Sequence, residues 1–171
     1  MRVIEAPNDI ILNDNEITCF LAGGITDCED WQSKVIEYLE ETIRLDDLVL
    51  LNPRRKTFDV TDKSASRKQI EWEFNALNNM DIFTMYFADS ASVQPICMYE
   101  LGRHLERMQH RFTHDWRDRI FVGIEDGYSR LTDVVIQTGL ALGGGECYMT
   151  HMTPDLHAQY IAKIYLKLRY K

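Results

Sequence analysis

A chain of 171 residues, with 45% hydrophobic and 27% charged side chains, is long enough to form one domain around a buried core. The net charge of −8 argues against a protein that binds a nucleic-acid backbone, which needs a basic face, but it does not exclude a small nucleoside or nucleotide. The four cysteines form no CxxC pair and no zinc spacing, and Cys19 and Cys97 lie in apolar segments. We therefore expect a single domain over residues 1–171, a reducing cytoplasmic location and no metal site.

Apolar runs alternate with segments of helical periodicity along the chain. The predicted strands are 17–22, 48–51, 82–87, 119–124 and 147–149, with 1–6 as a short edge strand or an arm. The predicted helices are 31–44, starting at the N-cap Asp30, then 69–79, 96–110, 133–142 and 154–170, and residues 54–68 are expected to form a polar loop. Strands joined through helices predict a three-layer α/β/α sandwich with a mostly parallel five-stranded sheet.

In such a sheet, ligands bind at the edge formed by the carboxyl ends of the strands. The first main strand ends at Ala22-Gly23-Gly24-Ile25, where the glycines either let a ligand approach the backbone or form a tight turn. This segment matches neither a dinucleotide-binding loop nor a Walker A loop. The second strand is followed by Asn52-Pro53-Arg54-Arg55, where two arginines either bind a phosphate or carboxylate or form a solvated charge pair.

Four acidic residues are candidates for catalysis near this edge. Glu100 follows a strand and lies near the start of a helix, so it is either a first-turn acid that favours the helix dipole or a catalytic carboxylate. Glu73 lies on the predicted helix 69–79. Asp81 precedes the third main strand, where turn chemistry is the alternative to a supporting role, and Asp89 follows the same strand. Several carboxylates at one edge separate in pKa, so that one acts as acid or base and another as an anion.

Two further side chains on the helix 69–79 are candidates for substrate binding. Gln69 lies four residues before Glu73 and shares its helix face. Trp72 either belongs to the core or forms a wall against which a base stacks.

An ordered set of short motifs across residues 17–140 resembles the nucleoside 2-deoxyribosyltransferase-like family. The motifs are Phe20-Leu21-Ala22-Gly23-Gly24-Ile25-Thr26, Asp30-Trp31-Gln32, Asn52-Pro53-Arg54-Arg55, Gln69-Ile70-Glu71-Trp72-Glu73, Asp81-Ile82, and Pro95-Ile96 through Glu100-Leu101-Gly102.

This resemblance implies a flavodoxin-like fold, a nucleophile at Glu100 and a helix acid at Glu73 that binds or protonates the substrate. It also implies a homo-oligomer, because the family builds sites between subunits. The chain departs from the family where the well-studied transferases carry a further aspartate shortly before the nucleophile. Here that stretch is Ser92-Val93-Gln94-Pro95, and Asp89 is the nearest acid.

The candidate residues suit cleavage of an N-glycosidic bond, in which one carboxylate stabilises or traps the sugar and a second acid protonates the departing base. Attack by another base gives transfer, and attack by water gives hydrolysis. We expect no cofactor and a small nucleoside or nucleotide as the partner, with neither polymeric nucleic acid nor a membrane. The alternatives are a deoxynucleoside 5′-monophosphate N-hydrolase, which Arg54 and Arg55 motivate, and a non-catalytic nucleotide-binding module.

Overall fold

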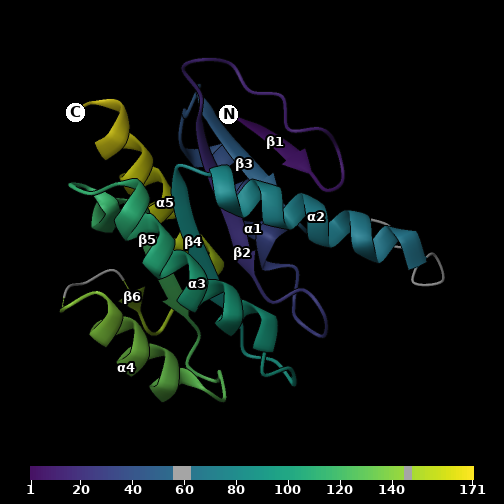
Figure 1. Cartoon of the computed structure of the whole chain (residues 1–171), viewed down its shortest axis with the longest axis vertical. Helices are drawn as coiled ribbons and strands as arrows, with labels where there is room; N and C mark the ends of the chain where they lie inside the picture. The colour runs from purple at the N-terminus through teal and green to yellow at the C-terminus, as the bar shows by residue number, and fades with distance from the viewer. Residues whose placement is uncertain (56–62, 145–147) are drawn as a thin grey trace.

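A computed structural model describes residues 1–55, 63–144 and 148–171. Its sheet has six strands, all parallel, in the order β1-β3-β2-β4-β5-β6 (Figure 1). The strands are β1 (Arg2–Glu5), β2 (Ile17–Gly23), β3 (Leu48–Asn52), β4 (Ile82–Phe87), β5 (Ile120–Ile124) and β6 (Tyr148–Met149).

The prediction of five strands is one strand short. The segment that the sequence left as an edge strand or an arm is β1, and it pairs in parallel with β3, from Arg2 opposite Val49 to Glu5 opposite Asn52. Without β1, the strand order is the 2-1-3-4-5 order of flavodoxin-like sheets, so the predicted three-layer fold is confirmed.

The helices are close to the predicted ranges. They are α1 (Trp31–Thr42), α2 (Lys63–Asn79), α3 (Pro95–Arg111), α4 (Leu131–Ala141) and α5 (Pro154–Arg169), with a 3₁₀ turn at Trp116–Arg119. Of the predicted loop 54–68, residues 54 and 55 lie outside any helix or strand, as expected. The prediction is wrong over residues 63–68, which form the first turns of α2, and residues 56–62 lie outside the described residues. Cys147, predicted to start the last strand, also lies outside them.

The start and the buried face of helix α1 follow from its local sequence. Asp30 is the predicted N-cap, and its side chain accepts a hydrogen bond from the backbone N–H of Ser33 at 3.1 Å. Trp31, Val35 and Leu39 are buried at a spacing of four residues, so one face of the helix packs on the sheet.

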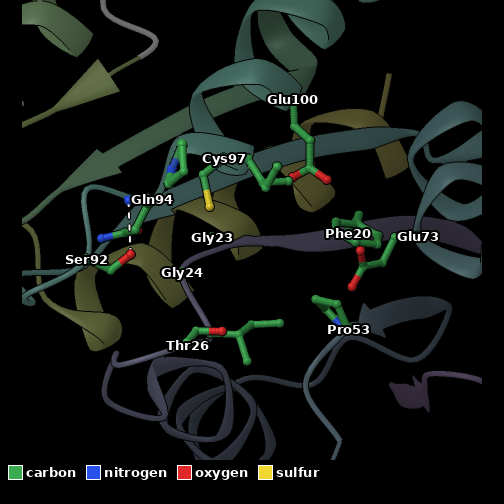
Figure 2. Close-up of a pocket in the computed structure, with 13 residues that line it drawn as sticks. Phe20, Gly23, Gly24, Thr26, Pro53, Glu73, Ser92, Gln94, Cys97 and Glu100 are labelled. Atoms are coloured by element: carbon green, nitrogen blue, oxygen red, sulfur yellow. Dashed lines mark hydrogen bonds between the residues drawn. The ribbon is translucent and has the colours of Figure 1, made fainter. Parts of the chain in front are cut away.

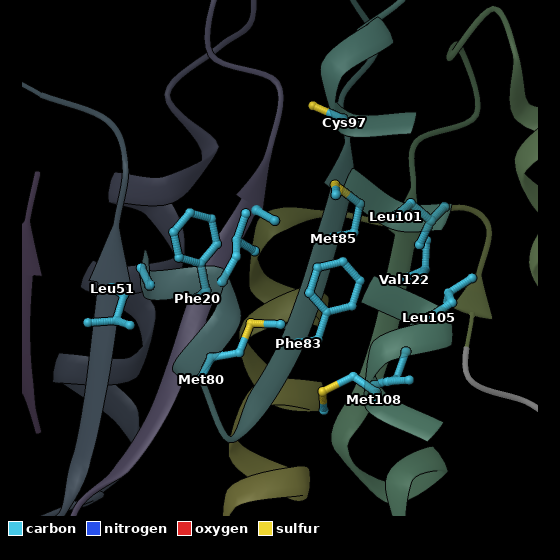
Figure 3. Close-up of a cluster of buried hydrophobic side chains, with 14 of the residues drawn as sticks. Phe20, Leu51, Met80, Phe83, Met85, Cys97, Leu101, Leu105, Met108 and Val122 are labelled. Carbon is cyan, nitrogen blue, oxygen red and sulfur yellow. The ribbon is translucent and has the colours of Figure 1, made fainter. Parts of the chain in front are cut away.

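Alternation along the strands divides the core into two layers. In β2, Phe20 and Ala22 face the layer under α2, α3 and α4, while Cys19 and Leu21 face the layer under α1 and α5. Figure 3 shows the first layer, where α3 residues such as Leu101 lie over the sheet. Because both faces are covered, the central strands are mostly apolar, with Thr84 as a buried polar residue in β4.

The order of the strands places a switch point between β2 and β4. The chain leaves β2 towards β3 on one side and later returns to β4 on the other, so the connections diverge above these two strands. In an open parallel sheet this divergence leaves a crevice at the carboxyl edge, where the glycine loop after β2 and the start of α3 meet.

Candidate functional site

A cavity of about 220 Å³ lies at this switch point. Figure 2 shows its walls, with the carboxyl groups of Glu100 and Glu73 turned towards the same space. The lining residues come from the ends of β2, β3 and β4 and from α2 and α3, and they are Phe20, Gly23, Gly24, Ile25, Thr26, Pro53, Glu73, Ser92, Gln94, Pro95, Ile96, Cys97 and Glu100.

The glycine loop after β2 forms one wall because no side chain fits there. A Cβ at Gly23 would lie 2.6 Å from the ring of Trp31, and the backbone φ of +153° is one that other residues rarely adopt. A Cβ at Gly24 would lie 2.5 Å from Oε1 of Gln94. Of the four residues predicted here, Gly23, Gly24 and Ile25 line the cavity, whereas Ala22 is buried in the core below it.

Arg54 supports this wall from behind and does not face the cavity. Its Nη2 donates to the carbonyl of Glu29 at 2.9 Å and to the carbonyls of Gly24, Ile25 and Cys28 at 3.4 Å, and its Nε donates to Gln32 at 2.9 Å. A guanidinium group is suited to this because its donors point outward in a fixed plane. Arg54 therefore holds the glycine loop in place through hydrogen bonds, and its position does not support the predicted role as a phosphate ligand.

Asn52, also predicted to bind substrate, shapes the exit of β3. Its Oδ1 accepts a hydrogen bond from the backbone N–H of Arg54 at 3.0 Å, and the residue is buried. It does not line the cavity, whereas Pro53, which follows it, does.

Glu100 enters the cavity from α3. The helix begins at Pro95, so Glu100 lies in its second turn, and the interpretation as a first-turn acid is wrong. Its carboxyl group accepts no hydrogen bond from the described residues. Burial, followed by the nearby charge of Glu73, raises the pKa of Glu100 from 4.5 to about 7, against the opposing effect of Arg103.

Glu73 reaches the cavity from α2 and belongs to a chain of hydrogen bonds. Gln69 donates from Nε2 to Glu73 Oε1 at 2.6 Å and to the carbonyl of Pro53 at 2.8 Å, and Gln69 Oε1 accepts from Arg55 Nε. Burial raises the pKa of Glu73, while the hydrogen bond from Gln69 and the charge of Arg55 oppose the rise. Gln69 and Arg55, both predicted to bind substrate, thus act on Glu73 and do not themselves line the cavity.

Gln94 and Ser92 line the cavity, although neither was predicted as a site residue. Gln94 is buried, with backbone φ and ψ of 49° and 54°, and its Nε2 donates to the carbonyl of Ala88 at 2.7 Å. Ser92 Oγ accepts from the backbone N–H of Gln94 at 3.1 Å. Oε1 of Gln94 has no hydrogen-bond partner among the described residues. Both residues lie between a strand end and a helix that starts with proline, and this position in the sequence could have identified them.

Trp72 and Asp81 are two further predicted site residues that do not line the cavity. Trp72 is buried against Phe20 and donates to the carbonyl of Asn8 at 2.7 Å, so it belongs to the core and is not a stacking wall in the cavity. Asp81 lies at the amino end of β4, and its carboxylate accepts from the backbone N–H and hydroxyl of Thr18 at 3.0 and 2.9 Å. This is the turn chemistry that the sequence offered as its alternative.

Asp89 lies at the carboxyl edge but not in the cavity. It is exposed, its backbone N–H donates to Glu125 at 2.6 Å, and its carboxylate packs over Gly127 on the side of β5. Among the four predicted acids, the structure therefore brings together Glu73 and Glu100.

Within the described ranges, no group of three histidine, cysteine or acidic side chains is arranged to hold a metal ion. None of the described helices is long and apolar enough to cross a membrane.

A crevice at the switch point of a parallel sheet, with two partly buried carboxyl groups and a glycine wall, defines an α/β protein that binds a small molecule. A family model described as nucleoside 2-deoxyribosyltransferase like matches residues 16–113, which is more than half of the chain. The chain belongs to this family, as its motifs predicted. The matched segment contains all the described residues that line the cavity. No curated protein matches the sequence.

Membership in this family relates the chain to enzymes of glycosyl transfer and indicates a small nucleoside as the type of ligand.

Proposed function

We propose that the protein cleaves the N-glycosidic bond of a deoxynucleoside, with Glu100 as the nucleophile and Glu73 as the acid that protonates the departing base. The observation that carries the proposal is the placement of these two carboxyl groups, from different helices, around one cavity at the switch point of the sheet. Neither is neutralised by a direct ion pair among the described residues, which is unusual for partly buried acids with a purely structural role.

The proposed chemistry follows that of retaining glycosidases. As the bond between C1′ and the base nitrogen breaks, positive charge develops on the sugar, and the Glu100 carboxylate forms an ester with C1′. Glu73 gives its proton to the base nitrogen, which takes the electron pair of the broken bond. A second base then attacks C1′ and releases a new nucleoside, or water attacks and releases the free sugar.

The monophosphate alternative rested on Arg54 and Arg55. Arg54 is held by the carbonyls of the glycine loop and by Gln32, and Arg55 donates to Gln69. Neither lines the cavity, whereas two carboxyl groups do, and these repel a phosphate dianion. We therefore propose the free nucleoside as the substrate. The homo-oligomer, the cytoplasmic location and the single domain over residues 1–171 stay predictions.

The test is a product assay by chromatography. The purified protein is incubated with a panel of deoxynucleosides and their 5′-monophosphates, each with and without a second free base. A new nucleoside that forms only with the acceptor base supports transfer, and free base released without an acceptor supports hydrolysis. If the folded protein binds nucleosides but releases no base across the panel, the proposal is wrong and a non-catalytic binding module takes its place.

A further inference from the structure

The two carboxyl groups of the cavity have different surroundings. Glu73 accepts a hydrogen bond from Gln69 at 2.6 Å, and the charge of Arg55 acts on it. Glu100 accepts no hydrogen bond from the described residues and is affected by burial and by the charge of Glu73. An N–H donor favours the ionised form of the carboxylate that accepts from it, so a negative charge is better accommodated on Glu73 than on Glu100.

The orientation of the Gln69 amide is fixed by its neighbours. The Pro53 carbonyl only accepts and the Arg55 guanidinium only donates, so Nε2 must face the carbonyl and Oε1 must face the arginine. The second hydrogen of Nε2 then points to Glu73. Gln69 therefore always presents a donor to Glu73, and its amide is polarised by Arg55 in the same direction.

We propose that Gln69 is a positioning residue that keeps Glu73 ionised in the empty site, so that the single proton shared by the two carboxyl groups resides on the nucleophile, Glu100. Two carboxyl groups in one cavity disfavour the doubly ionised state, and they hold one proton between them over a range of pH. Since this assignment concerns the same pair of residues, it rests on the proposed function.

The other charged and titratable groups near Glu73 and Glu100 do not reverse the placement of the proton on Glu100. Arg55, from the segment before α2, acts on Glu73. Arg103, on α3, lowers the pKa of Glu100 less than burial and Glu73 raise it, and its guanidinium donates to Asn78 and lies over the ring of Phe74. Cys97, also on α3, has its thiol pKa raised to about 12 chiefly by burial, so this thiol is neutral at physiological pH.

A protonated carboxyl group is a poor nucleophile, so Glu100 should react less readily with small electrophiles below its pKa than above it. When a nucleoside binds, the proton must pass from Glu100 to Glu73 and from there to the base nitrogen as the glycosidic bond breaks. Glu100 is then free to bond to C1′, and the carboxylate left on Glu73 is stabilised by Gln69 and Arg55. Gln69 thus assists the acid in giving up its proton, without contacting the substrate.

The experiment is a pH titration of the glutamate side-chain carboxyl carbons by ¹³C NMR, on the protein without substrate. Glu100→Gln and Glu73→Gln assign the two signals, Gln69→Met removes the amide at similar volume, and Gln137→Met, on the exposed face of α4, is the matched control. In the wild type, the signal that titrates near neutral pH is expected to be that of Glu100. It disappears in Glu100→Gln, and it moves to lower pH in Glu73→Gln because the charge of Glu73 is gone.

In Gln69→Met, the near-neutral titration is expected to pass from the Glu100 signal to the Glu73 signal, while Gln137→Met titrates like the wild type. The assignment is overturned if Glu73 holds the near-neutral proton in the wild type, or if Gln69→Met leaves both titrations unchanged. The titration needs no turnover. If it behaves as expected but no nucleoside is cleaved, the proposed function fails while the proton assignment holds.

Discussion

At the amino end of β4, Asp81 accepts hydrogen bonds from the backbone N–H and the hydroxyl of Thr18 and so ties β4 to β2. Beyond the carboxyl end of the same strand, Glu100 lies in a cavity with no hydrogen-bond donor among the described residues, and its pKa is raised to about 7. The Asp81 carboxylate is held by two hydrogen bonds from Thr18, whereas the Glu100 carboxyl group lies in an environment that destabilises its charge. This difference distinguishes a structural acid from a candidate nucleophile more reliably than residue type or position in the sequence.

Glu100 and Asp81 are expected to differ most in their effect on catalysis. Glu100→Gln removes the nucleophile, so kcat/KM for deoxynucleoside cleavage should fall by ~10³-fold or more. Glu106→Gln is the matched control, because Glu106 is an exposed acid on the same helix that pairs with His110. Chromatography of the released base measures both variants, and equal activity in Glu100→Gln and Glu106→Gln would contradict the role of Glu100.

For Asp81 the expected effect is on stability instead. Asp81→Ala leaves the N–H and hydroxyl of Thr18 without their acceptor, so the free energy of unfolding should fall by ~1–3 kcal/mol. Activity per folded molecule should stay close to wild type, because Asp81 lies at the opposite end of β4 from the cavity. Urea unfolding measures the first quantity and an active-site-normalised assay the second. A loss of activity without a loss of stability would place Asp81 in the site after all.

Glu100 should also make the stability of the protein depend on pH. The pKa of Glu100 in the folded chain lies above its ordinary value of 4.5, so the folded state binds more protons than the unfolded state between pH 4.5 and about 7, and stability falls as the pH rises through this window. Glu100→Gln escapes this loss. It should be more stable than wild type at pH 8, by ~1–3 kcal/mol, and no more stable at pH 4. Denaturant titrations at both pH values test the sign, and a Glu100→Gln variant less stable than wild type at pH 8 would contradict it.

A smaller effect is expected for Arg54→Met. This variant tests whether the guanidinium group holds the glycine loop in place or binds the ligand. Arg54→Met frees the loop carbonyls of Gly24 and Glu29, so kcat/KM should fall by about 10-fold through a loosened wall. The ratio of kcat/KM for a nucleoside to that for its 5′-monophosphate should change by less than ~2-fold. Parallel kinetics on both substrates measure the ratio. A selective loss of activity towards the monophosphate would indicate that Arg54 is a phosphate ligand.

The smallest effect is expected at Trp72. Trp72→Phe keeps most of the packing against Phe20 and loses the hydrogen bond to the Asn8 carbonyl, so the cost should be ~1 kcal/mol of stability. The KM for nucleoside should not change, because Trp72 does not line the cavity. Thermal unfolding and steady-state kinetics check the two statements. A KM that rises while stability is retained would assign the ring to the substrate.

The sequence predicted those features that depend on short-range pattern. Apolar runs located the central strands, Asp30 was recognisable as an N-cap, and the order of strands and helices brought Glu73 and Glu100 to one edge. The first turns of α2 were missed because residues 63–68 are mostly polar and lack an apolar stripe. The pairing of β1 was left open because a four-residue strand carries little periodic signal.

The remaining differences depend on tertiary contacts that no local pattern encodes. Arg54 and Arg55 are neighbours of the same type, yet one binds the carbonyls of the glycine loop and the other binds Gln69. The path of the loop after β2, which is distant in the sequence, decides which of the two arginines binds the loop carbonyls and which binds Gln69. The left-handed backbone of Gln94 is likewise unexpected for a glutamine, and the side chain of this residue makes a buried hydrogen bond to the Ala88 carbonyl.

The proposed covalent bond between Glu100 and the sugar can be detected by rapid-quench mass spectrometry of the protein. The protein is mixed with a deoxynucleoside, quenched in acid during the first turnover and digested. We expect an adduct with the mass of one deoxyribosyl group on the peptide that contains Glu100, and no such adduct in Glu100→Gln. Base release at an undiminished rate in Glu100→Gln, or an adduct located on a peptide without Glu100, would show that Glu100 is not the nucleophile.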